Sequence, residues 1–257
     1  MLRSPVREVD LLRKYEGVKD FIRKETQLAG SRGLVLGLSG GLDSSMALRA
    51  CVDSLGPGRV LGLLLPEKGL TSEKDMADAR LQAEGLGVPV REVDIAPILM
   101  SYPFKGGDRV TEGNLKARTR MTVLYYFANS ESRLVVGTGD RSEILCGYFT
   151  KYGDGGVDLL PLGGLYKTEL RVLGGHLGMA ASILRKPSSP GLWAGQTAEG
   201  EIGLTYETID RVLVALTEDG LSADQAKAKL SLGKEVDEVA ARFEASAHKR
   251  EMPHICR

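Results

Sequence analysis

The sequence predicts an α/β fold, in which a doubly wound, mostly parallel sheet of about five strands is flanked by helices and followed by a helical C-terminal part. Short apolar segments alternate with segments of helical periodicity. The short segments are apolar almost throughout, as strands covered on both faces are. After residue 147, helices alternate with glycine-rich loops, and no linker or repeat interrupts the chain. We therefore expect one domain over residues 1–257, with an α/β core at 1–147 and loops and helices at 148–257.

Local patterns predict the individual elements. Strands are expected at residues 34–38, 59–66, 88–94 and 133–139, and helices at 8–29, 44–55, 71–87, 114–130, near 142, and at 167–177, 205–217, 221–230 and 234–247. Thr71 and Ser72 are capping residues followed by acids, and glycines end that helix. Residues 106–112, rich in glycine and charge, are expected to form a loop. Strand–helix alternation of this kind is Rossmann-like.

Composition restricts the class of protein. The 257 residues are 42% hydrophobic, which is enough for one sizeable core. The formal net charge is zero, so nothing draws the whole chain to nucleic acid or an anionic membrane, and no apolar run is long enough to span a bilayer. Cys51, Cys146 and Cys256 are widely spaced, which indicates neither a disulfide framework nor a metal-binding pair. We expect a cytoplasmic protein with no nucleic-acid or membrane partner.

The segment SGGLDSS, residues 39–45, joins a predicted strand to a predicted helix. Backbone N–H groups of such a loop point at an anion, and the helix N-terminus adds partial positive charge. Gly40 and Gly41 allow close approach, and the serines can donate to phosphate oxygens. The lysine of a Walker loop is absent and Asp43 would repel a bare phosphate, so we expect a divalent cation between this carboxylate and pyrophosphate. An ordinary strand–turn–helix connection of small residues is the alternative.

Five further motifs follow this loop in order. They are NLKARTRM at 114–121, GTGDRSE at 137–143, GYFTKYGDGGVDLLPLGGLYKTEL at 147–170, LWAGQTAEGEIGLTYETID at 192–210 and HKR at 248–250. The loop resembles that of ATP pyrophosphatases, and all six segments together resemble ammonia-dependent NAD+ synthetases over nearly the whole chain. The resemblance implies ATP-dependent amidation of deamido-NAD+ (nicotinic acid adenine dinucleotide) to NAD+, the last step of NAD biosynthesis. An adenylated intermediate forms as pyrophosphate departs, and ammonia then displaces AMP.

The resemblance also implies roles for individual residues, with nucleotide binding in residues 1–147 and substrate loops in 148–257. ATP is expected to contact Gly37, Leu38, Ser39, Gly40, Gly41, Leu42, Asp43, Ser44, Thr138, Lys167 and Ser189. Mg²⁺ is expected on Asp43 and Glu143, and the catalytic residues are expected to be Asp43 and Lys167. Deamido-NAD+ is expected at Arg118, Lys151, Asp158, His248 and Lys249. By themselves, Glu143 is equally a first-turn acid of a helix and Thr138 a buried strand-end residue.

The chain departs from the family pattern at three places. Ala198 stands where the family commonly has aspartate, Asp140 and Arg141 replace an Asn-Lys pair, and SSPG at 188–191 replaces the usual PSAD around Ser189. The first change removes a carboxylate from a candidate lid, and the second leaves the rest of GTGDRSE in register. Two loops rich in Gly, Pro and polar residues, around 101–112 and 185–203, are the candidate lids that exclude water, the competing nucleophile.

The resemblance implies partners too. We expect no glutaminase domain in 257 residues, so ammonia is expected either free or from a separate glutaminase subunit. A homodimer is implied, which the aromatic helix at 121–129 suits, although a buried core helix has the same composition. A tRNA-thiolating ATP pyrophosphatase would need catalytic cysteines or a basic RNA face, and neither is visible. A non-catalytic nucleotide-binding regulator is opposed by the joint presence of Asp43, Glu143, Lys151 and Lys167.

Overall fold

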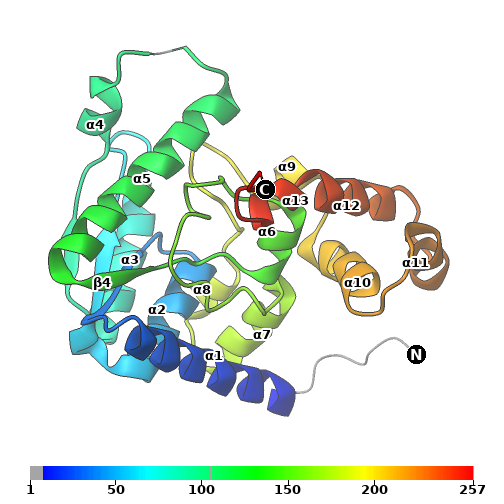
Figure 1. The fold of residues 1–257 in the computed structure, drawn as a ribbon, viewed down its shortest axis with the longest axis horizontal. Helices are drawn as coiled ribbons and strands as arrows, with labels where there is room; N and C mark the ends of the chain where they lie inside the picture. Colours follow the sequence, from blue (N-terminus) through cyan, green and yellow to red (C-terminus); the bar gives the residue numbers. More distant parts are fainter. Residues whose placement is uncertain (1–7, 105, 257) are drawn as a thin grey trace.

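The computed structural model describes residues 8–104 and 106–256, so the outermost residues of the expected domain and residue 105 of a candidate lid lie outside the description. Its centre is a parallel sheet in the order β3-β2-β1-β4 (Figure 1). The strands are β1 (Gly33–Gly37), β2 (Val60–Leu64), β3 (Val90–Glu92) and β4 (Arg133–Val136). About five strands are predicted from the sequence. The described residues form these four, and a single parallel bridge between Val136 and Leu159 lies where a fifth would extend the sheet beyond β4.

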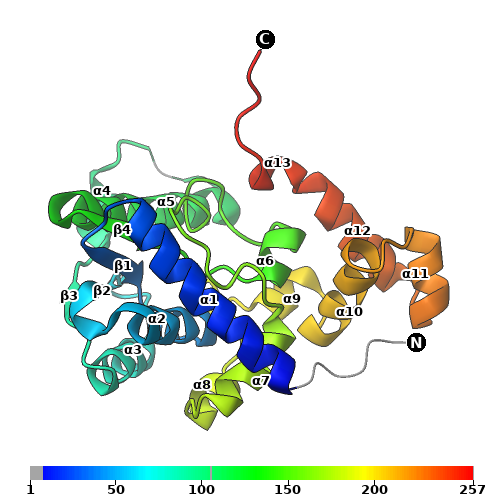
Figure 2. The same cartoon turned by 60° about the horizontal axis from the view of Figure 1, so that its bottom comes forward.

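Helices cover both faces of the sheet, which explains why the central strands β1 and β2 are apolar throughout (Figure 2). Their bounds are α1 (Glu8–Leu28), α2 (Leu42–Leu55), η1 (Pro57–Arg59), α3 (Glu73–Gly85), α4 (Ala96–Ser101), α5 (Arg109–Glu131), α6 (Arg141–Cys146), α7 (Lys167–His176), α8 (Ala181–Leu184), α9 (Ala198–Ile202), α10 (Tyr206–Thr217), α11 (Ala223–Leu230), α12 (Lys234–Ala245) and α13 (Ala247–Arg250). Leu34 and Leu36 of β1 pack with residues of α1, α2 and α3, whereas Val35 packs with residues of α5. The predicted α/β sheet is confirmed.

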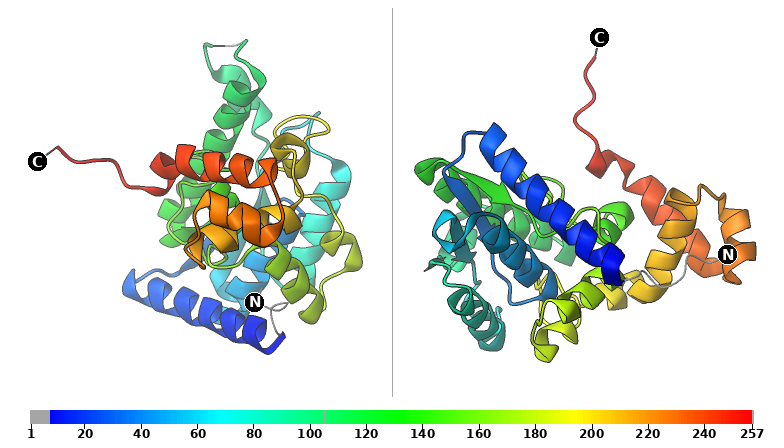
Figure 3. Two further views of the ribbon diagram at one scale, coloured as in Figure 1. Left: turned by 90° about the vertical axis from the view of Figure 1, so that its right-hand side faces the viewer. Right: turned by 90° about the horizontal axis from the view of Figure 1, so that it is seen from below.

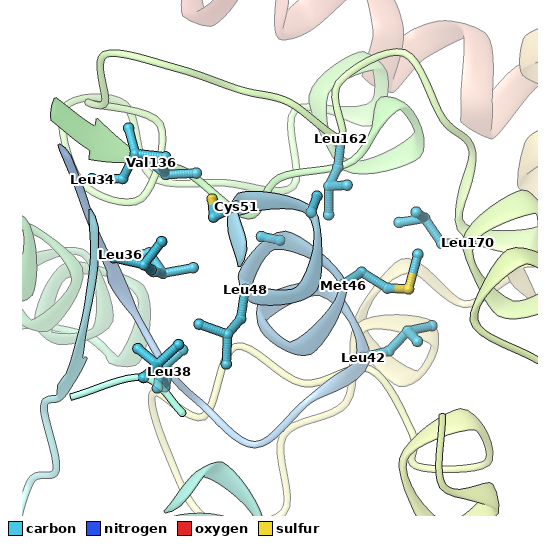
Figure 4. Packing of buried hydrophobic residues seen from close by; sticks show 14 of the residues in the cluster. Leu34, Leu36, Leu38, Leu42, Met46, Leu48, Cys51, Val136, Leu162 and Leu170 are labelled. Atoms are coloured by element: carbon cyan, nitrogen blue, oxygen red, sulfur yellow. The ribbon is translucent and has the colours of Figure 1, made fainter. Parts of the chain in front are cut away.

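Helix α2 is the centre of the main hydrophobic core (Figure 4). Its Leu48 side chain lies toward β1, and its Met46 lies toward Leu170 of α7. Cys51 of the same helix is 0% exposed, which confirms that it packs in the core. The start of α2, where the glycine loop ends, is therefore held by packing on both sides.

The long helix α5 begins earlier than the sequence predicts. Residues 109–112 were expected in a loop, but they form the first turn of α5. The Asp108 carboxylate accepts a hydrogen bond from the Thr111 backbone N–H over 2.7 Å and caps this turn. The prediction is wrong here because glycine and charge dominate the local composition and conceal the cap. The short helices α4, α8, α9 and α13 were not predicted, since each has too few residues to show a period.

The predicted helical C-terminal part is confirmed. Helices α10, α11 and α12 share a second hydrophobic cluster, which contains Ile209, Val212 and Val236, and they extend from the side of the molecule where α6 and α7 lie (Figures 1 and 3). The predicted internal division at residue 147 stays a prediction. In the described part of the chain, no helix combines the length and apolar character needed to cross a membrane.

Candidate functional site

The glycine loop runs from the end of β1 into the first turn of α2, so residues 37–44 are brought together as expected. Its own serines hold it: the Ser39 backbone N–H donates to Ser44 Oγ over 3.3 Å, and the hydroxyls of Ser44 and Ser45 donate to the Gly41 carbonyl. Gly41 is the N-cap of α2, and no side chain there bonds to the first backbone N–H groups of the helix. These groups are donors suited to an anion.

Gly40 is required by its conformation and by a neighbouring helix. Its φ of +71° lies in the left-handed region, and a Cβ atom at this position would lie 2.3 Å from the Asp75 carbonyl oxygen of α3. The first turn of α3 therefore packs directly against the glycine loop.

The side chain of Lys167, the first residue of α7, is completely buried and contacts three carboxylates. Its Nζ atom lies 2.7 Å from Asp43 Oδ1, 2.9 Å from Asp140 Oδ2 and 3.0 Å from Glu143 Oε1. The same atom lies 5.2 Å from the centroid of the Tyr206 ring. We call Asp43, Asp140, Glu143 and Lys167 the carboxylate cluster. It unites the loop aspartate, the start of α6 and the start of α7. The predicted contact of Lys167 with an ATP phosphate stays a prediction.

Hydrogen bonds between helix ends fix the cluster. Asp140 caps α6: its Oδ1 accepts from the Glu143 backbone N–H over 2.8 Å, and the Glu143 side chain accepts from the Asp140 backbone N–H over 3.3 Å. Behind them, the Ser142 hydroxyl accepts from the Lys167 backbone N–H over 2.9 Å and donates to Asp210 of α10 over 2.5 Å. The other Asp210 oxygen accepts from the Thr168 backbone N–H over 2.9 Å. The starts of α6 and α7 are thereby held against α10.

Burial and crowding shift the pKa of the cluster's groups. Burial, opposed by Lys167 and reinforced by Asp43, raises the pKa of Asp140 to about 6. Burial also raises the pKa of Glu143 well above its ordinary value; the neighbouring carboxylates of Asp140 and Asp43 raise it further, and Lys167 opposes them. Burial alone would lower the pKa of Lys167, but Asp140, Glu143 and Asp43 raise it well above its ordinary value. Lys167 is therefore a stable cation, whereas Asp140 and Glu143 hold protons more readily than free carboxyl groups do.

Carboxylates of the cluster are candidate ligands for a divalent cation. Within residues 8–104 and 106–256, no group of three or more His, Cys, Asp or Glu side chains is arranged to hold a metal ion. Fully ionised, however, the carboxylate cluster has a net charge of −2, with Asp43 Oδ1, Asp140 Oδ2 and Glu143 Oε1 all facing the single Lys167 ammonium. Two carboxylates with partial exposure, about 20% at Asp43 and 19% at Glu143, suit a Mg²⁺ ion whose remaining ligands are phosphate oxygens and water.

The other two residues expected at ATP lie in connecting segments. Thr138 is partly buried between β4 and α6, two residues before Asp140. Ser189 is exposed, and its hydroxyl accepts a hydrogen bond from the Gly191 backbone N–H over 3.1 Å. Among the described residues, no side-chain hydrogen bond joins Thr138 or Ser189 to the carboxylate cluster, so the role of these two residues in ATP binding stays a prediction.

Most residues expected at the dinucleotide form a second group, joined through backbone atoms. Arg118 of α5 donates to the Lys151 carbonyl over 3.3 Å, and the Lys151 ammonium donates to the His248 carbonyl. Lys249 donates to the carbonyls of Gly147 and Phe149, at 2.7 and 2.8 Å. α5, the loop after α6 and the C-terminal α13 thus meet.

Asp158 lies apart from this group. Its carboxylate accepts from the Tyr125 hydroxyl of α5 over 2.9 Å and from the Val135 backbone N–H of β4 over 2.7 Å. Both of its oxygens are therefore in use within the chain. The cavity of about 370 Å³ that includes Tyr125, Tyr152 and Val157 among its lining residues lies close by.

Two lysines join the candidate lid around 185–203 to the glycine loop and to α5. Lys186 donates to the Gly40 carbonyl of the glycine loop over 2.9 Å and lies 2.5 Å from Asp75 of α3. Lys116 of α5 donates to the Leu192 carbonyl over 3.0 Å. The lid therefore bridges the glycine loop and α5.

Ala198, at the position where the family pattern has aspartate, is 1% exposed and belongs to the second hydrophobic cluster. Its backbone N–H donates to the Ser188 carbonyl over 2.9 Å. A carboxylate near this segment is supplied by Glu201, which accepts from the Tyr148 hydroxyl over 2.5 Å.

Sequence reasoning did not identify Asp140 and Lys186 as parts of the site. A signal for Asp140 was present, because DRSE combines an N-cap aspartate with a glutamate three residues later. No local pattern indicates that Lys186 reaches the glycine loop, since the two are 146 residues apart in the sequence.

Comparisons with known proteins show the family and the fold. Residues 14–253 match the family model described as NAD synthase. The chain is 51% identical over 247 residues to the NH3-dependent NAD+ synthetase of Hyperthermus butylicus, covering 93% of this chain and 90% of that protein. Among solved structures it is similar to an NMN synthetase from Francisella tularensis, with a TM-score of 0.83 and 32% sequence identity. The match covers 96% of this chain and 98% of that chain. An NH3-dependent NAD synthetase from Campylobacter jejuni in complex with nitrate gives a TM-score of 0.82 and 29% sequence identity. The match covers 96% of this chain and 99% of that chain.

Proposed function

The chain belongs to the NAD synthase family, and we propose that its carboxylate cluster and glycine loop are where it activates ATP. The chain is a ligase that amidates deamido-NAD+ to NAD+ with ammonia, the final step of NAD biosynthesis, through an adenylated intermediate that releases pyrophosphate and AMP. One observation carries the assignment of the site: a single buried ammonium contacts the loop aspartate, Asp43, and the α6 glutamate, Glu143.

In this proposal the glycine loop binds the pyrophosphate part of ATP. The uncapped N–H groups at the start of α2 would be its donors, and the hydroxyls of Ser39, Ser44 and Ser45 hold the loop in place. The nicotinate carboxylate of deamido-NAD+ attacks the α-phosphorus, and the bond to the bridging oxygen of pyrophosphate breaks. Because no side chain acts as a nucleophile, the chain contributes position and charge.

Asp43 and Glu143 are the residues that would hold Mg²⁺, and Lys167 would orient both carboxylates. The ion, when bound, neutralises charge on the departing phosphates. The negative charge of the fully ionised carboxylate cluster and the partial exposure of Asp43 and Glu143 support this assignment. Thr138 and Ser189 would complete the ATP contacts from the segments after β4 and α8.

Deamido-NAD+ would lie along the group formed by Arg118, Lys151, His248 and Lys249, with Asp158 at its edge. The three-way meeting of α5, the loop after α6 and α13 supports a binding surface there. We propose that a homodimer completes this surface. The support is the poor burial of α5, whose described buried residues are only Gly113, Ala117, Thr119 and Ala128.

The source of ammonia and the location of the protein are also proposals. Free ammonia is the first expectation, because the Hyperthermus butylicus relative, of which the match covers 90%, is named as NH3-dependent. A separate glutaminase subunit is the other source compatible with the sequence. A cytoplasmic location is supported by the three cysteines, all of which are free.

The decisive assay supplies Mg-ATP and deamido-NAD+ with either ammonium or glutamine, and measures NAD+, AMP and pyrophosphate. We expect equal amounts of NAD+ and AMP with ammonium alone. Pyrophosphate without NAD+ would mean that adenylation proceeds and amidation fails, and ATP binding without turnover would indicate a regulator. Because one similar structure is an NMN synthetase, nicotinic acid mononucleotide is the matched competing substrate. A higher kcat/KM with the mononucleotide would contradict the proposed substrate class.

A further inference from the structure

Asp140 is a completely buried carboxylate with a partner for each of its oxygens. Oδ1 accepts from the Glu143 backbone N–H over 2.8 Å, and Oδ2 lies 2.9 Å from Lys167 Nζ. Its own backbone N–H donates to Glu143 Oε2 over 3.3 Å. Asp140 therefore positions the backbone and the side chain of Glu143 and also the ammonium of Lys167. Because its exposure is 0%, it does not present a surface to substrate.

The groups around Asp140 come from several elements, and only one of them is a cation. Asp43 of α2 and Glu143 of α6 are acids, Tyr206 of α10 is a neutral ring, and Lys167 of α7 has the positive charge. If Asp43 and Glu143 turned from Lys167 to a metal ion, the buried ammonium would lose two of its three partners. Asp140 is the partner it would keep, which avoids the cost of an unpaired buried charge.

The chemistry of Asp140 matters here as well as its shape. An asparagine has one carboxamide oxygen and one NH2 group, so it cannot place separate oxygens on the Glu143 N–H and on Lys167. One of these donors would face another donor. An uncharged residue would also leave Asp43, Glu143 and Lys167 with a net charge of −1 in place of −2.

We propose that Asp140 is a positioning residue that sets the affinity of the Asp43–Glu143 pair for a divalent cation. It retains Lys167 when the pair takes up the ion, and it supplies the extra negative charge that makes uptake favourable. This inference rests on the proposed function of Asp43 and Glu143.

The test measures Mn²⁺ binding in the presence of a non-hydrolysable ATP analogue, with free Mn²⁺ followed by electron paramagnetic resonance. Asp140→Asn and Asp140→Ser are compared with wild type, because asparagine and serine both retain N-cap ability without charge. Loss of such an outer partner weakens metal affinity by about 10- to 100-fold, and we expect both variants to lose that much. Raising Mg²⁺ should restore most of their kcat, which a purely structural defect would not allow.

Asp53→Asn is the matched control. Asp53 lies on the same helix, about 15 Å from Asp43 by helix rise, and pairs there with Arg49 and Tyr15. It removes the same charge and should leave Mn²⁺ affinity unchanged. If both Asp140 variants bind Mn²⁺ like wild type while Asp43→Asn does not bind, the inference is overturned and the proposed function stands. If wild type retains no more Mn²⁺ than the nucleotide alone, both are overturned.

Discussion

The ammonium of Lys167 is enclosed by acids and aromatic carbon, and it has no exposed surface. We predict that Lys167→Met lowers the free energy of unfolding by about 3–5 kcal/mol without metal, because breaking a buried ion pair leaves uncompensated charge. Urea denaturation measures this loss, and added Mg²⁺ should return part of it. Arg13→Met is the control: it breaks a pair with Asp10 in which the side chains are 82% and 46% exposed, so its loss should cost less than about 1 kcal/mol. Equal losses in the two variants would contradict the account of the cluster.

The cysteines give a prediction about pH. Burial raises the pKa of both Cys51 and Cys146 from 9.0 to about 12, whereas Cys256 is exposed. At about pH 8 a thiol reagent should modify one cysteine per folded chain and all three in urea, because only the thiolate reacts. Since the folded-state pKa lies above the unfolded one, the folded chain holds these protons more tightly. Their contribution to stability is present below pH 9.0 and is lost as the pH rises toward about 12. Rapid labelling of all three in the folded protein would show that the α2 core is open.

Among the elements, the candidate lid around 185–203 is restrained by its own Lys186, which binds the glycine loop, and by Lys116 of α5. We predict that Lys186→Met, which removes the bond to Gly40, accelerates chymotryptic cleavage near Trp193 and weakens the protection that ATP with deamido-NAD+ gives. Lys19→Met on α1, whose partner is Glu16 one helical turn away, is the control and should leave cleavage unchanged. Slow cleavage in both variants, with and without ligands, would mean that the segment is a fixed part of the site.

The sequence predicts elements well where burial repeats with a period. Strands buried on both faces are apolar throughout, and the Ser72 cap of α3 is visible as a residue type and bonds to the Asp75 N–H as expected. Elements of one turn, such as α8 and α13, leave no such pattern. For the site, the loop and the roles of Asp43 and Glu143 could be proposed from sequence alone. That Lys167 meets both, together with Asp140, depends on how α2, α6 and α7 pack, which no local pattern encodes.

At the scale of the whole molecule, α5 offers a face that the chain itself leaves uncovered. Its Tyr126 is 70% exposed, and Met121 and Tyr125 line the cavity beside it. We predict a dimer in solution with a mass of twice 27.7 kDa, measured by light scattering after gel filtration. Tyr126→Asp should give a monomer with reduced activity, while Val172→Asp, at another exposed apolar residue, should leave the dimer intact. A wild-type monomer with full activity would contradict the proposed homodimer.

The strand order has a consequence for how the chain is made. One edge of β1 pairs with β2, residues 60–64. The other edge pairs with β4, in which the partner of Gly33 is Arg133, one hundred positions later in the sequence. During synthesis one edge of β1 therefore remains without its partner strand until β4 has left the ribosome. Asp43 can form its ion pair with Lys167 only later still. Such distant pairings form slowly and leave the nascent chain open to wrong partners, so this enzyme's supply in the cell depends on how well that edge is protected while translation continues.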